Sequence, residues 1–119
     1  MIPDSFEYQR PTSLDEALSL KEQGAVCLAG GTDLVVQLRD EKLKPSMIVD
    51  IKALDELKGI RRGEDGLFIG AATPAQELAE HADAQCYRAL VEGASVLGCY
   101  EIRQRATVGG NICNASPSA

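Results

Sequence analysis

The sequence predicts an α+β fold in two parts, and two patterns carry this prediction. In the first half, an apolar run at 25–29, a helical pattern at 33–39 and a second apolar run at 47–51 follow one another. A strand, a crossover helix and a second strand in this order favour a right-handed unit with parallel strands. In the second half, two strand-like segments flank Glu64-Asp65-Gly66, whose Asp-Gly pair is typical of a hairpin.

The first part, residues 1–56, is expected to open with a strand at 6–10 that Pro11 ends. Ser13-Leu14-Asp15-Glu16 then has the pattern of a capping box, which predicts a helix that stops near Gly24. We expect this helix to turn four apolar side chains toward the core. They are Leu14, Ala17, Leu18 and Leu20.

The second part, residues 57–119, is expected to begin near Leu57. After the hairpin, Thr73-Pro74 offers an N-cap with proline at the first helical position, and Gln76 completes a capping box. A longer helix is predicted over about 85–97, followed by a loop that carries Arg103 and Arg105.

Composition excludes several classes of function. The chain has 119 residues, 45% of them apolar, which is ordinary for a globular domain. It carries a net charge of −6 without a basic stripe, which argues against binding to nucleic acid or to anionic membranes. No apolar run approaches the roughly 20 residues of a membrane span, and the start lacks the pattern of a signal peptide. We therefore expect a cytoplasmic protein.

The residues that could bind metal or act as acids and bases are scattered. None of the four cysteines forms a C-x-x-C pair, and the single histidine, His81, is five residues from the nearest of them, Cys86. We therefore predict no metal site, name no catalytic residue, and expect Cys27 to be packed in its apolar run.

The most informative feature is a pair of segments in which two adjacent glycines precede a polar residue. Glycine allows consecutive amides to approach an anion without a side chain in the way, and a helix start adds further amides. Several hydrogen bonds to a charged group, at about 1.5–3 kcal/mol each, would dominate such binding. The candidate residues are Leu28, Ala29, Gly30, Gly31, Thr32, Asp33 and Leu34 in the first segment and Thr107, Val108, Gly109, Gly110 and Asn111 in the second.

A purely structural interpretation remains open for each segment, namely that the glycines form tight turns of the fold. Neither segment is G-x-G-x-x-G or G-x-x-x-x-G-K-[ST]. Asp33 also places a carboxylate beside the proposed anion site, where it caps the helix or binds a ribose hydroxyl or a water. Thr32 is the other candidate for the helix cap.

Both segments closely resemble the two flavin signatures of the FAD-binding subunit of molybdenum hydroxylases, the family of the xanthine dehydrogenase flavin subunit and the carbon monoxide dehydrogenase medium chain. The second signature extends through Ile112-Cys113-Asn114-Ala115-Ser116-Pro117. Residues 6–17 and the strand Val49-Asp50-Ile51 also match this family, so the resemblance covers the whole chain.

The resemblance implies a vanillyl-alcohol-oxidase-type (PCMH) FAD-binding fold of two α+β subdomains, here the N-terminal portion. Residues 1–56 would be the first FAD-binding subdomain, and residues 57–119 the truncated start of the second. It implies that both segments hold the FAD pyrophosphate, and that Leu97, ten residues before Thr107, also contacts FAD. It implies a molybdopterin subunit and a 2Fe-2S subunit as partners, with electrons passing from the iron–sulfur clusters through FAD to NAD or another acceptor.

Family members are more than twice as long as this chain, so the chain alone is expected to be inactive. Two alternatives stay open at this point. One is a truncated, non-redox module that binds a nucleotide or docks to a subunit. The other is a flavin reductase of the cell-wall pathway, which shares the fold and against which Asn111-Ile112-Cys113-Asn114-Ala115-Ser116-Pro117 argues.

Overall fold

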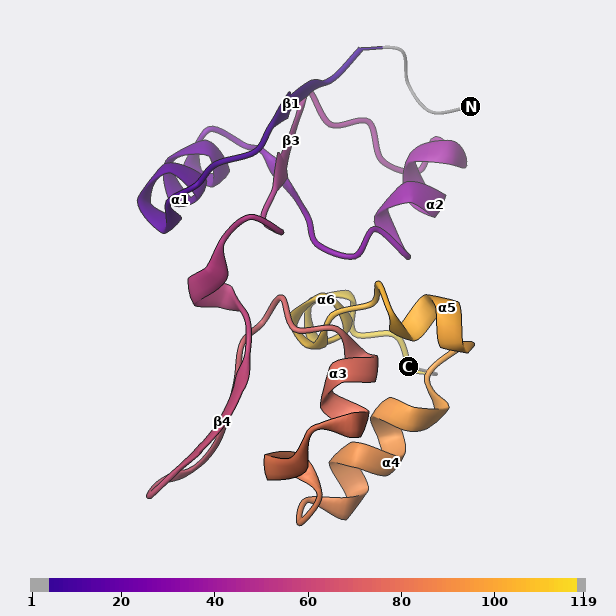
Figure 1. Ribbon diagram of the computed structural model, residues 1–119. Coiled ribbons are helices and arrows are strands. Elements are labelled where there is room, and N and C mark those ends of the chain that lie inside the picture. Colours follow the sequence, from indigo (N-terminus) through magenta and orange to yellow (C-terminus); the bar gives the residue numbers. More distant parts are fainter. Residues whose placement is uncertain (1–4, 118–119) are drawn as a thin grey trace. The chain divides into compact units, whose positions relative to one another are not determined.

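A computed structural model describes residues 5–117 (Figure 1). Contacts within the chain separate two compact units, with the division between Asp55 and Glu56. Each unit is described by itself.

The first unit is built on a three-stranded parallel sheet. Its strands are β1 (Glu7–Gln9), β2 (Val26–Leu28) and β3 (Met47–Asp50), in the order β1-β3-β2. Tyr8 faces Ile48 on one side of β3, and Leu28 faces Asp50 on the other. The predicted parallel pair is therefore confirmed, with β1 added on the far side of β3.

The central strand of this sheet is buried between β1 and β2 and beneath α1 (Leu14–Glu22). Ile48 and Val49 are buried, and α1 packs on β3 with Ala17 inside. The predicted cap forms, since the Glu16 amide donates to Ser13 Oγ at 3.2 Å. Leu18, however, is 53% exposed, so its predicted place in the core is wrong.

The second helix of this unit, α2 (Leu34–Arg39), buries Leu38. Cys27 lies on β2 but is exposed, and the expectation that it is packed is wrong. Strand β2 is an edge strand of the described sheet, and successive side chains of a strand point to opposite faces. One of its three side chains can therefore be exposed while its neighbours are half-buried.

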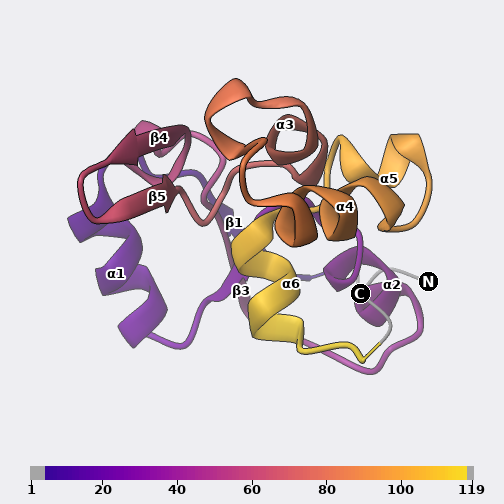
Figure 2. The ribbon, with the colours of Figure 1, turned by 90° about the horizontal axis from the view of Figure 1, so that it is seen from below.

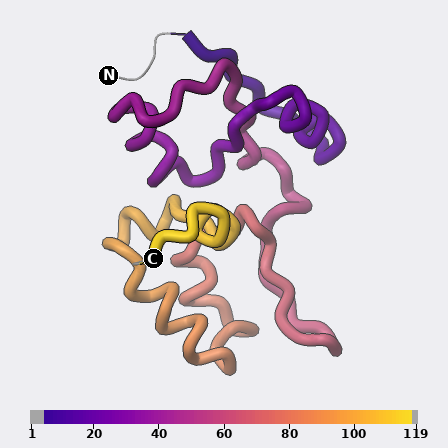
Figure 3. Tube along the Cα trace, turned by 180° about the vertical axis from the view of Figure 1, so that it is seen from behind, coloured from indigo at the N-terminus to yellow at the C-terminus, as the bar shows by residue number. Residues whose placement is uncertain are grey.

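The second unit begins with a short 3₁₀ turn, η1 (Asp55–Leu57), and the predicted hairpin. Strands β4 (Ile60–Gly63) and β5 (Gly66–Ile69) pair antiparallel, with Gly63 opposite Gly66. In Figure 3 the hairpin runs beside the helices of the same unit. Glu64 and Asp65 form its two-residue turn.

The rest of the second unit is helical. Its helices are α3 (Ala75–Glu80), α4 (Arg88–Val96), α5 (Tyr100–Arg103) and α6 (Val108–Asn114), with a 3₁₀ turn, η2 (Ala82–Ala84), after α3. Helices α3 and α4 pack together (Figure 2). Leu78 of α3 is buried, whereas no residue of α4 is, and Leu90 of its predicted apolar face is 37% exposed.

Two local predictions in this unit are wrong. Pro74 occupies the N-cap position of α3 without a side-chain hydrogen bond, because the Thr73 hydroxyl accepts from the Gly59 amide at 3.1 Å instead. Arg103 does not lie in a loop but ends α5.

Candidate functional site: two glycine segments

The first glycine segment connects β2 to α2 and depends on a glycine for its shape. Gly31 has a φ of +78°, a left-handed conformation that residues with a side chain rarely adopt. Its carbonyl accepts from the Val35 amide at 3.0 Å and so starts the first turn of α2. A Cβ on Gly31 would lie 3.2 Å from Leu28 Cδ1 and 3.3 Å from Val35 Cγ2, so the turn is also tightly packed.

The amides of this segment are available to a ligand. Among residues 5–117, no group accepts a hydrogen bond from the backbone N–H of Gly30, Gly31, Thr32, Asp33 or Leu34. All five residues are half-buried or exposed. Unpartnered backbone donors beside glycines are what an anion requires, and these residues therefore fit a phosphate-bearing cofactor.

The side chain of Asp33 does not occupy the amides of this segment. Asp33 occupies the N-cap position of α2, but its carboxylate makes no capping hydrogen bond and is exposed. The predicted cap position is therefore confirmed for Asp33, but neither its carboxylate nor the Thr32 hydroxyl makes a capping hydrogen bond within the described residues. An exposed carboxylate at this position is free to bind a hydroxyl group.

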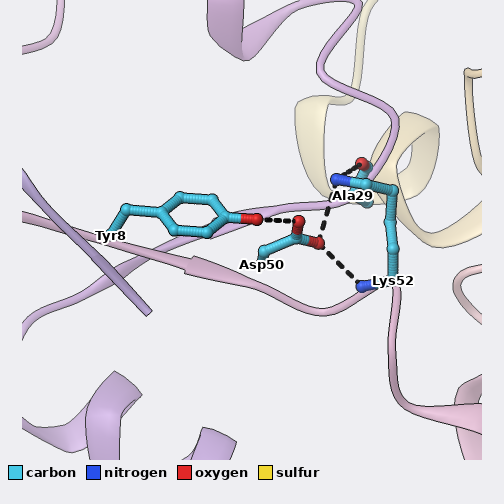
Figure 4. A network of polar contacts seen from close by, with 4 residues as sticks. All are labelled: Tyr8, Ala29, Asp50 and Lys52. Atoms are coloured by element: carbon cyan, nitrogen blue, oxygen red, sulfur yellow. Dashed lines mark hydrogen bonds and ion pairs between the residues drawn. The ribbon is translucent and has the colours of Figure 1, made fainter. Parts of the chain in front are cut away.

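A polar network contacts the first segment at Ala29 and connects it to β1 and β3 (Figure 4). Asp50, at the end of β3, is 3% exposed and accepts from the Tyr8 hydroxyl on β1. Lys52 Nζ lies 2.9 Å from Asp50 Oδ1 and also donates to the Ala29 carbonyl at 3.3 Å. The Lys52 amide adds a further hydrogen bond to Asp50 Oδ1 at 2.9 Å.

This network sets the ionisation of its members. Burial by itself raises the pKa of Asp50, but the hydrogen bonds from Tyr8 and Lys52 and the Lys52 charge outweigh it and hold that pKa below its usual value. The same contact raises the pKa of Tyr8, because its hydroxyl donates to a carboxylate. Asp50 is therefore a buried, paired anion.

The second glycine segment is the first turn of α6 and differs from the first. Thr107 is the N-cap, and its Oγ1 accepts from the Gly110 amide at 3.1 Å. The amides of Val108 and Gly109 donate to the carbonyls of Thr73 and Ala71, at 3.0 and 2.8 Å. The Asn111 amide donates to the Thr107 carbonyl at 3.0 Å.

The expectation that these four amides are bare is therefore wrong. The fold itself uses them, two to attach α6 to residues 71–73 and two to form its first turn. Close packing also accounts for the glycines, since a Cβ on Gly109 would lie 2.8 Å from the Ala71 carbonyl oxygen. On Gly110 it would lie 2.8 Å from Thr107 Oγ1.

Leu97, the remaining predicted contact, follows α4 and is half-buried. Its carbonyl accepts from Arg103 Nη1 at 3.3 Å, and Arg103 Nε donates to Gln76 Oε1 at 2.9 Å. Arg103 is thus engaged within the second unit and orients the turn after α4.

Sequence reasoning missed Lys52 altogether and gave Asp50 no role. The available signal was a charged residue at the end of an otherwise apolar strand, because a carboxylate in such a place needs a partner.

Within residues 5–117 no three His, Cys, Asp or Glu side chains gather where they could share a metal ion. No helix in the same range has the length and apolar character needed to span a membrane.

Comparison with known proteins identifies the family. Residues 4–119 match the family model described as "FAD binding domain in molybdopterin dehydrogenase". The chain is 38% identical to the nicotinate dehydrogenase FAD-subunit of Eubacterium barkeri, over 93% of this chain and 39% of that protein. It is 42% identical to the xanthine dehydrogenase FAD-binding subunit of Escherichia coli, over 98% of this chain and 41% of that protein.

Solved structures agree. Carbon monoxide dehydrogenase from Hydrogenophaga pseudoflava superposes with a TM-score of 0.92 at 35% identity, covering 98% of this chain and 42% of that one. Quinoline 2-oxidoreductase from Pseudomonas putida gives a TM-score of 0.93 at 26% identity, covering 100% and 42%. The chain thus spans about two fifths of these proteins. It belongs to the FAD-binding domain family of molybdopterin dehydrogenases, and its cofactor is FAD.

Proposed function

We propose that this chain forms the diphosphate-binding part of a flavin subunit that relays electrons from iron–sulfur clusters through FAD to NAD or another acceptor. A molybdopterin subunit and a 2Fe-2S subunit are its proposed partners. The support is the match over residues 4–119 together with the five amides of residues 30–34, which have no partner among residues 5–117. When bound, FAD supplies the capacity to accept and release electrons singly or in pairs.

The residues of this chain bind and orient the cofactor in this proposal. The amides of residues 30–34 donate to the diphosphate oxygens, and the exposed Asp33 carboxylate accepts from a ribose hydroxyl. The second glycine segment contributes in another way, because its amides are already used by the fold. Its helical turn instead offers an exposed surface without a side chain at Gly110. The residues of this segment are Thr107, Val108, Gly109, Gly110 and Asn111. Leu97 adds an apolar contact.

We also place the protein in the cytoplasm. All four of its cysteines are unpaired, as is usual for proteins of a reducing compartment.

A flavin titration tests the proposal. The native, full-length protein is stripped of flavin and titrated with FAD and with riboflavin, which lacks the phosphates. FAD is expected to bind at least tenfold more tightly, a difference of about 1.4 kcal/mol. Equal affinities for the two would contradict recognition through the diphosphate.

The matched variants are Gly30→Asp and Gly93→Asp. Gly30 lies in the first glycine segment and its φ is not positive, so a side chain there meets no left-handed backbone strain, whereas Gly93 lies on α4 with open space around it. Only Gly30→Asp is expected to weaken FAD binding. Gly110→Asp is a poorer probe because its side chain would displace the Thr107 cap.

A second candidate function, docking to a partner subunit, is favoured by exposed apolar side chains on the second unit. Val96 is 78% exposed and Ile112 is 73% exposed. Apolar surface that gathers in one patch is typical of sites that bind protein, and both side chains belong to helices of the second unit. A chain that docks a partner without binding FAD would show no flavin affinity in the same titration.

A further inference from the structure

The Lys52 ammonium group lies between a buried carboxylate and the first glycine segment. It is 2.9 Å from Asp50 Oδ1 and 3.3 Å from the Ala29 carbonyl oxygen, and both contacts are visible in Figure 4. Lys52 follows β3, while Ala29 follows β2 and lies 23 residues earlier in the chain. One side chain thus connects the ends of two neighbouring strands.

The carboxylate that binds the Lys52 ammonium is itself held in place. Asp50 is the last residue of the central strand and 3% exposed, and it is fixed from the other side by the Tyr8 hydroxyl. No buried side-chain nitrogen or oxygen atom in the described residues lacks a hydrogen-bond partner. The Lys52 side chain is 36% exposed, but its ammonium group contacts a carboxylate that is itself buried and held in place.

The contact with Ala29 determines the direction of an amide. The Ala29 carbonyl and the Gly30 N–H belong to the same peptide unit, which is planar and trans, so they point in opposite directions. Among the described residues, Lys52 is the only donor to the Ala29 carbonyl. Fixing that oxygen therefore fixes the Gly30 N–H, the first of the five unpartnered donors.

The charge of Lys52 has a second consequence. A cation bound to a peptide oxygen polarises that peptide and makes its N–H a stronger donor, as in other chains of hydrogen bonds. The Gly30 amide thus gains both direction and strength from a side chain on the opposite end of the same peptide.

We propose that Lys52, anchored on Asp50, is a positioning residue that aims the Gly30 amide at the anionic part of the bound dinucleotide. The inference rests on the proposed function, because it explains how the first glycine segment of that site keeps its conformation. It assigns no contact between Lys52 and the cofactor.

Two measurements on Lys52→Met in the native, full-length protein test this. With selective ¹⁵N-glycine labelling, the order parameter of the Gly30 amide in the flavin-free protein is expected to fall from about 0.85 to below about 0.6. The Kd for FAD is expected to rise about tenfold, which corresponds to about 1.4 kcal/mol, while the Kd for riboflavin stays unchanged.

The controls separate positioning from loss of charge. Lys44→Met removes one positive charge and one ion pair, to Glu41 at 3.0 Å, from the surface of the same unit, and is expected to change neither measurement. Lys52→Arg keeps a cation and is expected to restore most of the Gly30 order parameter and most of the affinity for FAD. If Lys52→Met does not fold, Lys52→Gln takes its place with the same expectation.

The outcomes distinguish this inference from the proposed function. An unchanged order parameter for Gly30 in Lys52→Met would overturn the positioning role, even if FAD binding weakened. If the wild-type protein bound FAD no better than riboflavin, the proposed function would fail, and the order parameter would still decide whether Lys52 positions Gly30.

Discussion

The amide nitrogen of Gly109 lies 2.8 Å from the carbonyl oxygen of Ala71, and this contact attaches α6 to the segment before α3. A Cβ on Gly109 would lie 2.8 Å from that same oxygen and from Ala71 Cβ, closer than real Cβ atoms approach. The second glycine segment is therefore a packing device as well as a candidate cofactor contact.

Gly109→Ala is expected to lower the free energy of unfolding by about 1–3 kcal/mol, because α6 must move away from Ala71. Denaturant unfolding measures this change. The matched control is Gly93→Ala on α4, where nothing lies within 4 Å of the new Cβ. There the better helix propensity of alanine is expected to raise stability by up to about 1 kcal/mol. Equal effects at both positions would contradict the packing explanation.

Thr107→Ala is expected to cost about 1 kcal/mol, because it removes the hydroxyl oxygen that caps the Gly110 amide at 3.1 Å. Thr107→Ser keeps that oxygen and should retain most of the stability. Thermal unfolding of the two variants makes the comparison. A serine variant as unstable as the alanine variant would show that the methyl group, and not the cap, matters at this buried position.

Much of the local structure could be predicted from the sequence, because it depends on neighbouring residues. The Ser13 cap, the hairpin turn at Glu64-Asp65 and the buried strand around Val49 all follow from patterns a few residues long. The glycine segments were also visible in this way, since a Gly-Gly pair before a helix has a restricted set of uses.

Contacts between distant residues could not be predicted in the same way. Thr73 has the sequence context of a helix cap, yet its hydroxyl bonds Gly59, 14 residues away. Arg103 bonds Gln76, 27 residues away, and Lys52 bonds Ala29. In each case the partner lies far away along the chain, so only the tertiary fold brings the two groups together.

The contact of Thr73 with Gly59 leads to a third prediction. Thr73 is completely buried, and its hydroxyl accepts from the Gly59 amide at 3.1 Å and donates to the Gly59 carbonyl at 3.3 Å. Thr73→Val keeps the shape but leaves the Gly59 amide unpaired, at an expected cost of about 1–3 kcal/mol, while the Gly59 carbonyl still accepts from the Gly70 amide at 2.8 Å. Thr73→Ser, which loses only a methyl group, should cost about 0.8 kcal/mol. Chemical denaturation that ranks serine below valine would contradict this account.

The depressed pKa of Asp50 predicts how stability depends on pH. A carboxyl whose pKa is lower in the folded than in the unfolded state, here below the ordinary 3.8, stabilises the fold above that ordinary value. This contribution is lost as the pH falls through the folded-state pKa. Asp50→Asn lacks the charge at every pH, so it is expected to be about 1–3 kcal/mol less stable than wild type at pH 7, with a gap that narrows below about pH 4.

Urea unfolding of both proteins at several pH values between 7 and 3 measures that gap, and carboxyls elsewhere cancel because both proteins carry them. Glu41→Gln is the matched control, since Lys44 also lowers the pKa of Glu41 through a hydrogen bond, but on the exposed surface. Its gap to wild type should be small and should shrink with added salt, because water and ions screen such a pair. A gap for Asp50→Asn that stayed constant down to pH 3 would show that the Asp50 charge does not stabilise the sheet.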